Sequence, residues 1–403
     1  MEGLVLRLDG GDPPGEDGLD PKRLFRLHAL LMLAAPGVAP GSSRIAEPGR
    51  PESSVSEALV ILRENTPIVG LTLVYCLAGY LVEAVAGLPR RMENVWFETT
   101  YQVYPLLSLL ALPFALAAHR WTIRDAEGRW IPGVAGWQSS FGTAGNGFFT
   151  PSRIVGVMVT AVIMPLFLNT YGSWKGMIPD LHPFSLDGPL TSLDRAMHLG
   201  WLPWELLHPV VGFPAITRTI DVLYILWLPL NAGVLIWQGW DRGRDRSRFF
   251  LSYLLVYILL GTGGAIALSA AGPCYYEAVT GQPSPYAPLM QYLHALDAEQ
   301  PIIALRVQHT LWENYARSLS MPFVGISAMP SVHVAVAVLF ALIGWRTSRW
   351  LGWVFTAFAG VVLVGSVHLG WHYAVDGYLS IVATLAIWWL VGALIDRRQQ
   401  AAR

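Results

Sequence analysis

Charged residues are scarce in this chain. Lys, Arg, Asp and Glu together make up 14% of its 403 residues, whereas 53% are hydrophobic and 17 are Trp. A soluble globular domain is usually about 25% charged, so this composition excludes a soluble protein and indicates an integral membrane protein. The formal net charge is −1. Because the polyanionic backbone of a nucleic acid attracts basic surfaces, we expect no nucleic-acid partner.

Cysteine is nearly absent as well. The two that occur are Cys76, within an apolar run, and Cys274, within a loop. A disulfide between them is not expected, and neither has the spacing of a metal ligand. No cluster of carboxylates suggests a metal site either. We therefore predict that the protein uses no metal and no cofactor.

Long hydrophobic runs, by contrast, are frequent. A membrane-spanning helix needs about 20 apolar residues, and eight segments reach or approach this length. They are Pro67–Leu88, Thr99–Ala118, Ile154–Trp174, Val222–Trp240, Phe249–Ala271, Pro330–Trp345, Trp350–Val367 and Gly377–Ile395. The sixth is the shortest, so we expect its start to lie at the membrane surface. The predicted fold is all-α, a polytopic transmembrane helix bundle with about eight spans.

Composition divides the chain into three parts. Residues 1–60 form a predicted cytoplasmic tail, with a short amphipathic helix at Leu24–Ala39 followed by a Pro/Ser/Gly linker. Residues 61–150 contain two additional N-terminal spans. Residues 151–403 contain the remaining six spans, which we expect to form one core.

Arginine marks one side of the predicted bundle. Four arginines lie in Asp241–Arg248, between the fourth and fifth spans, and Arg346 and Arg349 flank the turn between the sixth and seventh. Loops rich in Lys and Arg face the cytoplasm, so we predict a multi-pass protein of the plasma or inner membrane. The outer side then receives Lys175–Ile216, Gly272–Met329 and the turn between the last two spans.

The outer segment Gly272–Met329 is too long for a simple connector. Tyr286–Leu296 and Pro301–Arg317 within it have the apolar spacing of helices, and Pro183–His208 is a similar piece. We expect interfacial helices that lie on the outer membrane surface and cover a site there.

A change from polar to apolar residues occurs in Ser327–Phe340, with the sequence SAMPSVHVAVAVLF. Proline is favoured in the first helical turn, where we expect Pro330. A helix N-terminus offers free N–H groups and a positive dipole end to a phosphate, and Ser331 can add its hydroxyl. His333, in the same turn, can give a proton to a leaving oxygen. The alternative is a Ser cap beside a histidine without a role.

The turn between the last two spans contains His372 and Asp376, four residues apart. On a helix this spacing places both on one face, where Asp376 can hold the imidazole. The alternative is an interfacial anchor, because Trp371 and Tyr373 are typical of membrane interfaces. The chain crosses the bilayer after His333 and returns. His333, His372 and Asp376 are therefore predicted at one depth in one leaflet, as an acid/base and nucleophile set.

Two further candidates follow the third span. Lys175 lies just past its predicted end on the outer side, and His182 lies in the segment that follows. A Lys at the end of a span commonly extends its amine to the interface, which is the alternative here. Beside the other motifs, Lys175 is a candidate phosphate ligand, a compact point charge. His182 can do the same if it is protonated.

These residues resemble the motifs of the type 2 phosphatidic acid phosphatase superfamily. That family carries Lys-x6-Arg-Pro, Pro-Ser-Gly-His and Ser-Arg-x5-His-x3-Asp. The corresponding segments here are Lys175-x6-His182-Pro183, Pro330-Ser331-Val332-His333 and Gly365-Ser366-x5-His372-x3-Asp376. Both arginines, which would bind phosphate oxygens bidentately, are replaced. The segment His372-Tyr373-Ala-Val-Asp376, with His368 one turn earlier, looks more like inositol phosphorylceramide synthases and their bacterial relatives.

The resemblance implies a six-span catalytic core and a membrane enzyme that works in two steps on a lipid phosphate ester. His372 would attack phosphorus and form a phosphohistidine that Asp376 steadies. His333 would protonate the leaving oxygen and then deprotonate the acceptor. Phosphate oxygens would be held by Lys175, Ser331, His182 and His368.

The acceptor remains open at this point. An alcohol would make the protein a phosphotransferase, which the missing arginines and the long outer segments favour. Water would make it a lipid phosphatase or pyrophosphatase. A transporter is a third possibility, but its polar residues should lie near the midplane, whereas the polar residues here gather in one leaflet.

Overall fold

The computed structural model describes residues 54–89, 151–317 and 325–401. Every regular element in these ranges is a helix, which confirms the predicted all-α fold. The predicted amphipathic helix Leu24–Ala39 and the second predicted span, Thr99–Ala118, lie outside the described residues. Residues 61–150 are therefore represented by their first span alone.

Six described segments are long and apolar enough to cross a membrane, and they coincide with six predicted spans. The segments are Leu62–Ala86 in α2 (Ser54–Ala86); Arg153–Leu181 in α5 (Pro151–Leu181); Pro214–Trp240 in α8 (Pro214–Ile225) and α9 (Trp227–Trp240); Arg244–Ala267 in α10 (Arg244–Leu255), η1 (Val256–Gly264) and α11 (Ala265–Ala267); α16 (Arg349–His368); and α17 (Ala374–Ala401). The sixth predicted span is a shorter apolar helix, α15 (Val332–Thr347). The chain is thus a multi-pass membrane protein.

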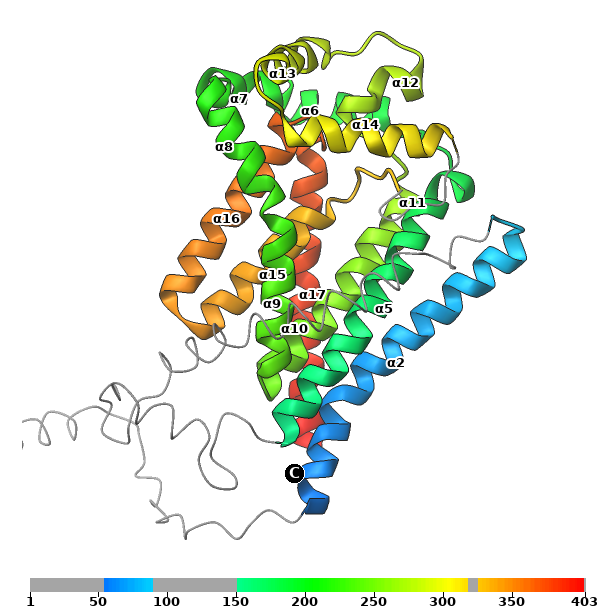
Figure 1. Ribbon diagram of the computed structural model, residues 1–403, viewed down its shortest axis with the longest axis vertical. Coiled ribbons are helices and arrows are strands. Elements are labelled where there is room, and N and C mark those ends of the chain that lie inside the picture. Colours follow the sequence, from blue (N-terminus) through cyan, green and yellow to red (C-terminus); the bar gives the residue numbers. More distant parts are fainter. Residues whose placement is uncertain (1–53, 90–150, 318–324, 402–403) are drawn as a thin grey trace, which may run out of the picture. The chain divides into compact units, whose positions relative to one another are not determined.

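Helix α15 lies inside the bundle, packed against α16 and α17 (Figure 1). Its sequence is apolar on all sides, which is typical of a helix enclosed by other helices. Its fully buried side chains are Val334, Ala335, Val336, Ala337, Leu339 and Phe340. Because Ser331 and Val332 are buried too, the start of this helix is surrounded by protein.

The span that packs against the start of α15 contains a π-helix, η1. Such elements are rare and frequently occur near functional sites. Glycines of η1 allow the start of α15 and the residues before it to approach the η1 backbone closely. A Cβ on Gly261 would lie 2.8 Å from the Tyr171 ring and 3.0 Å from Val332, and one on Gly264 would lie 3.0 Å from Pro330. The segment before α15 therefore rests directly on the backbone of η1.

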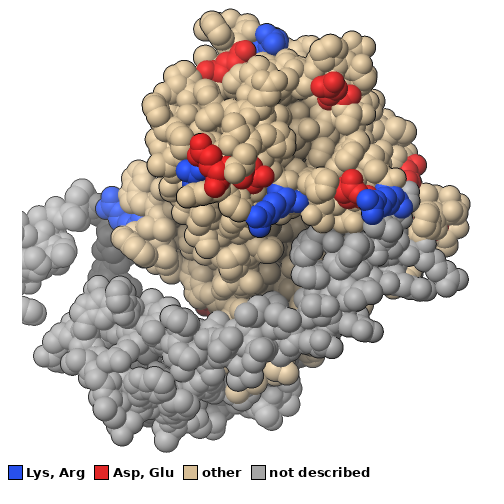
Figure 2. Space-filling view, turned by 45° about the horizontal axis from the view of Figure 1, so that its top comes forward, with Lys and Arg blue, Asp and Glu red and all other residues tan. Residues whose placement is uncertain are grey.

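Shorter helices gather at one end of the bundle (Figure 1). They are α6 (Asp187–Met197), α7 (Pro203–Val211), η2 (Pro273–Tyr275), α12 (Tyr276–Thr280), α13 (Ala287–Glu299) and α14 (Ile303–Ala316). The helices predicted in the long outer segment match α13 and α14 to within a few residues. Figure 2 shows that charged side chains of both signs occur in a few small groups over this end, and most of the visible described surface is uncharged. We call these six elements the cap helices.

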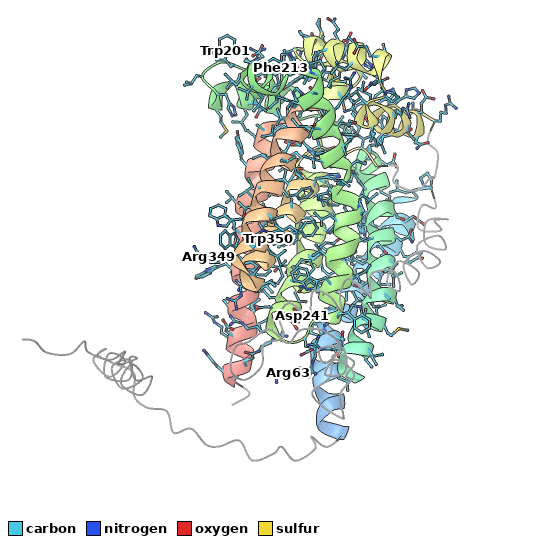
Figure 3. The ribbon with its side chains drawn as sticks, turned by 60° about the vertical axis from the view of Figure 1, so that its left-hand side comes forward. Arg63, Trp201, Phe213, Asp241, Arg349 and Trp350 are labelled. Carbon is cyan, nitrogen blue, oxygen red and sulfur yellow. The ribbon has the colours of Figure 1, made fainter. Side chains whose placement is uncertain are left out.

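The opposite end carries the arginine-rich segment. Figure 3 places Asp241 and Arg63 at this end and Trp201 and Phe213 among the cap helices. The predicted four-arginine loop is shorter than expected, because α10 begins at Arg244. Arg246 is buried within the helix and donates hydrogen bonds to Asn65 Oδ1 at 3.0 Å and to Thr160 Oγ1 at 3.3 Å. This arginine therefore joins three spans.

Candidate active site

Helix α15 begins where the sequence changes from polar to apolar. Ser331 is its N-cap, and the Ser331 hydroxyl oxygen accepts a hydrogen bond of 3.4 Å from the Val334 N–H. Pro330, predicted in the first turn, instead lies before the cap. The reason is that a serine side chain can satisfy a free N–H of the first turn, so the helix starts after it. The hydroxyl hydrogen of Ser331 is not used by this bond.

His333 lies in the first turn of α15 and contacts two aromatic rings from the span Pro214–Trp240. The Tyr224 ring stacks on the imidazole at a centroid distance of 5.3 Å, and the Trp227 ring lies at 4.4 Å. The Trp227 indole N–H also donates to the His333 carbonyl oxygen at 3.1 Å. Helices α8 and α9 thereby fix both the backbone and the ring of this residue.

The predicted pair of His372 and Asp376 forms, although not along a helix face. His372 lies in the turn before α17, and Asp376 lies in the first turn of that helix. Asp376 Oδ2 accepts hydrogen bonds from His372 Nδ1 at 3.3 Å and from the Tyr373 N–H at 3.1 Å. The carboxylate thus caps the helix as well as holding the imidazole. Both side chains are buried.

The two imidazoles approach each other from different helices. The ring centroids of His333 and His372 are 6.3 Å apart. Since Nδ1 of His372 faces Asp376, Nε2 is the ring nitrogen that can meet a substrate. The imidazole at the start of α15 and the imidazole in the turn before α17 are therefore neighbours, and the Asp376 carboxylate holds the second one.

Lys175 lies inside α5, because this helix continues to Leu181 beyond the predicted end at Trp174. The Gly325 backbone lies directly against Lys175, so a side chain at position 325 would overlap it. A cation from α5 is therefore brought towards the start of α15.

The other two predicted phosphate ligands are engaged elsewhere. His182 follows α5, and its Nδ1–H donates to the Ile266 carbonyl oxygen at 2.6 Å. His368, the last residue of α16, is completely buried and contacts Thr217 Oγ1 through Nε2 at 2.9 Å. Each ring is directed to a partner in a neighbouring span. The structure therefore does not direct either ring towards the pair His333 and His372.

Two aspartates of α6, which no sequence motif singled out, hold the turn between α16 and α17 in place; we call this segment the candidate catalytic turn. Asp194 accepts hydrogen bonds from the Ala374 N–H at 2.9 Å and the Val375 N–H at 3.0 Å, at the start of α17. Asp187 accepts from the Tyr373 hydroxyl at 2.8 Å and from the Gly272 N–H at 2.8 Å. Burial raises the pKa of both carboxyl groups, while the N–H donors act in the opposite direction. Their seven-residue spacing places them on one face of α6, the signal available in the sequence.

Candidate metal ligands do not gather in the described ranges. Within them, no group of three or more His, Cys, Asp or Glu side chains is arranged to hold a metal ion. The thiols of Cys76 and Cys274 are both free, and Cys76 Sγ lies 3.0 Å from Thr170 Oγ1.

Comparison with protein-family models matches residues 188–390, or 203 of the 403 residues, to the PAP2 superfamily, the type 2 phosphatidic acid phosphatases. The chain belongs to the PAP2 superfamily. The match includes His333, His372 and Asp376 and begins after Lys175 and His182. Members of the PAP2 superfamily are phosphatases or phosphotransferases, which makes this chain an enzyme of that general class. The chain matches no curated protein and no solved structure in the two other comparisons.

Proposed function

We propose that this membrane protein is a phosphotransferase that moves a phospho-head group from a lipid phosphate ester to an alcohol through a phosphohistidine at His372. The observation that carries the proposal is the 6.3 Å separation of the His333 and His372 rings, with Asp376 bonded to Nδ1 of His372. A phosphoryl group between the rings can meet one nitrogen as a nucleophile and the other as a proton donor.

In the first step, Nε2 of His372 forms a bond to phosphorus and the ester P–O bond breaks. The leaving oxygen takes the proton of His333 and departs as an alcohol. Asp376 holds the ring in the correct orientation and stabilises its positive charge. In the second step, His333 removes the proton of the acceptor hydroxyl, whose oxygen bonds to phosphorus as the N–P bond breaks. Both histidines return to their starting states.

The phosphoryl oxygens carry negative charge throughout, and the groups around the start of α15 suit them. The ammonium of Lys175, which packs against Gly325 in the segment before α15, supplies a positive charge. The N-terminus of α15 supplies the positive end of a helix dipole, and the Ser331 hydroxyl can donate a hydrogen bond. In this scheme, His182 and His368 have no role in holding phosphate, since each is bonded to a neighbouring span.

The inositol phosphorylceramide synthase branch of the superfamily suits the chain better than generic lipid phosphatases do. In the family motifs, arginine stands where this chain has His182 and Ser366. The Ser366 hydroxyl donates to the Leu363 carbonyl oxygen at 2.8 Å within its own helix. Ser366 therefore does not replace the bidentate phosphate contact that an arginine makes.

The proposal also places the site in the outer leaflet of a plasma or inner membrane. The arginine-rich segment lies at one end of the bundle and the cap helices at the other (Figure 3). Cytoplasmic loops carry the excess of Lys and Arg, which supports an outward position for the cap helices and the candidate catalytic turn beneath them.

The test is direct detection of the covalent intermediate. A lipid with radioactive phosphate should label the purified protein, and the label should be acid-labile and stable in base, as a phosphohistidine is. We expect His372→Ala to abolish labelling and His294→Ala, at an exposed position on α13, to retain it. Labelling that persists in His372→Ala would contradict the proposal.

The product distinguishes alcohol from water as the acceptor. The alternative function, a lipid phosphatase or pyrophosphatase, uses the same His333, His372 and Asp376 and differs only in the second step. Adding alcohols to the labelled protein should move the label into a new phosphodiester. If free phosphate, or the free phosphorylated head group, is the product under all conditions, the protein is a hydrolase.

A further inference from the structure

A second polar cluster lies beside the candidate catalytic turn, at the contact of α8, α13 and α16. Thr217 Oγ1 has three neighbours within hydrogen-bond distance: the Val211 carbonyl oxygen at 3.3 Å, the Tyr292 hydroxyl at 2.9 Å and His368 Nε2 at 2.9 Å. A threonine hydroxyl has one hydrogen and can accept two hydrogen bonds. The three neighbours therefore match the three hydrogen bonds that the Thr217 hydroxyl can make, one as donor and two as acceptor.

Only one arrangement of hydrogens makes all three contacts hydrogen bonds. The Val211 carbonyl accepts and never donates, so Thr217 gives it the single hydroxyl hydrogen. Tyr292 and His368 Nε2 must then both donate to Thr217. His368 is consequently the tautomer with the proton on Nε2, and its Nδ1 carries a bare lone pair.

That lone pair has no partner. His368 is 0% exposed, and Nδ1 makes no hydrogen bond within the described residues. Buried polar atoms are nearly always paired, and an unpaired acceptor is unfavourable. His368 Nδ1 can therefore accept a hydrogen bond from a donor that is not part of the described chain.

Two further buried atoms near the catalytic residues are also without partners. The Gln308 amide Nε2 donates to the carbonyl oxygen of Leu369 at 2.9 Å, which leaves its Oε1 unpaired, and Gln308 is 4% exposed. The Tyr224 hydroxyl is unpaired as well, on a side chain that is 7% exposed and stacks on His333. Gln308 thus adjoins the start of the candidate catalytic turn, and Tyr224 adjoins the proposed acid.

The hydrogen-bonding capacity of these three atoms limits the chemical classes of ligand that can bind them. Two are pure acceptors and one is a hydroxyl, so the ligand must donate hydrogen bonds. A phosphate group only accepts at these positions and does not fit. None of the three side chains carries a charge to balance an ammonium. Uncharged hydroxyl groups, which both donate and accept, match the set.

We propose that His368 Nδ1, Gln308 Oε1 and the Tyr224 hydroxyl bind hydroxyl groups of the substrate. This inference rests on the proposed function, because it assigns a second subsite to the same catalytic pair. The hydroxyls belong either to the head group of the donor lipid or to a hydroxylated acceptor. Both sources share one chemistry, and the experiment separates them.

The variants are chosen to remove one atom each. Tyr224→Phe keeps the ring that stacks on His333 and removes only the hydroxyl. His368→Gln places an amide near the position of Nε2, so it retains a donor to Thr217 and lacks Nδ1. His368→Asn places its amide near the position of Nδ1 and loses the Thr217 contact. His309→Ala, on the exposed side of α14 next to Gln308, is the matched control.

Two arms use the purified full-length protein in mixed micelles. The donor arm compares the rate of labelling from phosphatidylglycerol, phosphatidylethanolamine and phosphatidic acid. The acceptor arm measures the ratio of two products of the labelled enzyme, one formed when the phospho-group is transferred to glycerol and the other when it is transferred to water. We expect Tyr224→Phe and His368→Gln each to lower the preference for the hydroxylated substrate about tenfold in one arm, the effect of a lost hydrogen bond in a buried site. His368→Asn should lose less, and His309→Ala should match the wild type.

Each result has a defined meaning. A loss in the donor arm assigns the hydroxyls to the lipid head group, and a loss in the acceptor arm assigns them to the acceptor. If His368→Gln and Tyr224→Phe slow all substrates equally, or keep the wild-type preferences while His372 still becomes labelled, the inference is overturned and the proposed function stands. If a preference for phosphatidylethanolamine is what the variants lose, the inference is also overturned. Absence of any label on the wild type fails the proposed function, and the inference falls with it.

Discussion

Replacing His333 with alanine is expected to slow turnover of an alkyl phosphate ester lipid by about 10³-fold, within the range measured for general acid–base catalysis. The reason is that an alkoxide is a poor leaving group and needs the proton that His333 supplies. A nitrophenolate leaving group, by contrast, is a weak base and departs without protonation. For a substrate with this leaving group, the first step should slow by less than about tenfold. The measurement is the rate of phosphohistidine formation with each substrate.

The substitution removes the ring contacts with Tyr224 and Trp227. It retains the hydrogen bond from the Trp227 indole N–H, because this bond is made to the carbonyl oxygen of residue 333. His294→Ala, on an exposed position of α13, provides a control for purification and lipid dispersion. Equal losses on the two substrates would show that His333 does not protonate the leaving group. In that case its position 6.3 Å from His372 would have to serve another purpose, such as orienting the phosphate.

Replacing Asp194 with alanine is the second change with a large expected effect. Its carboxylate caps α17 from another helix, with one oxygen on the Ala374 N–H and the other on the Val375 N–H. Removing it leaves two buried N–H groups unpaired beside Asp376. We expect the free energy of unfolding to fall by about 2 kcal/mol, typical of a lost cap with charged hydrogen bonds. The candidate catalytic turn should shift, and turnover should fall about 10²-fold.

The measurements are thermal unfolding in detergent and steady-state kinetics on the same samples. A positioning role predicts that kcat falls more than the KM of the donor lipid rises, because Asp194 contacts the turn and not the substrate. Asp194→Asn retains one acceptor oxygen and should recover part of both losses. Glu299→Ala is the control, since this carboxylate is 70% exposed and pairs with Arg218 at the surface, where ion pairs contribute little. Full activity in a less stable Asp194→Ala would contradict the positioning role.

His333 and His372 are held in place by different parts of the bundle. His333 is fixed by the aromatic rings of α8 and α9, and His372 is fixed by Asp376 from the first turn of α17. Asp187, through the Tyr373 hydroxyl, and Asp194, through the Ala374 N–H, hold the residues that follow His372. Groups that must meet a phosphorus atom in line need supports of this kind, since displacements of about 1 Å slow reactions strongly. In the proposed chemistry, the cap helix α6 thus serves to position the residues around His372.

The sequence by itself predicted the six membrane-spanning segments of the described residues, and it singled out two histidines whose rings lie close together. Hydrophobic runs report helices because the bilayer requires every backbone group of a span to be paired within the segment, a property local to the chain. The spacing of His372 and Asp376 is local too. The length of the intervening spans was enough to predict that His333 would lie at the same depth, and the two rings do meet.

Only the tertiary structure decided which other polar groups join them. Asp194 reaches residues 180 positions later in the chain, and His368 pairs with Thr217 across 151 positions. Such contacts depend on how the helices pack, and no pattern within one segment reports them. For the same reason, His182 and His368 looked equivalent to Lys175 in the sequence, while the packing directs their rings to Ile266 and Thr217. The run of apolar residues fixes where a helix lies in the membrane, but the partner of each buried polar atom is chosen by the neighbouring helices.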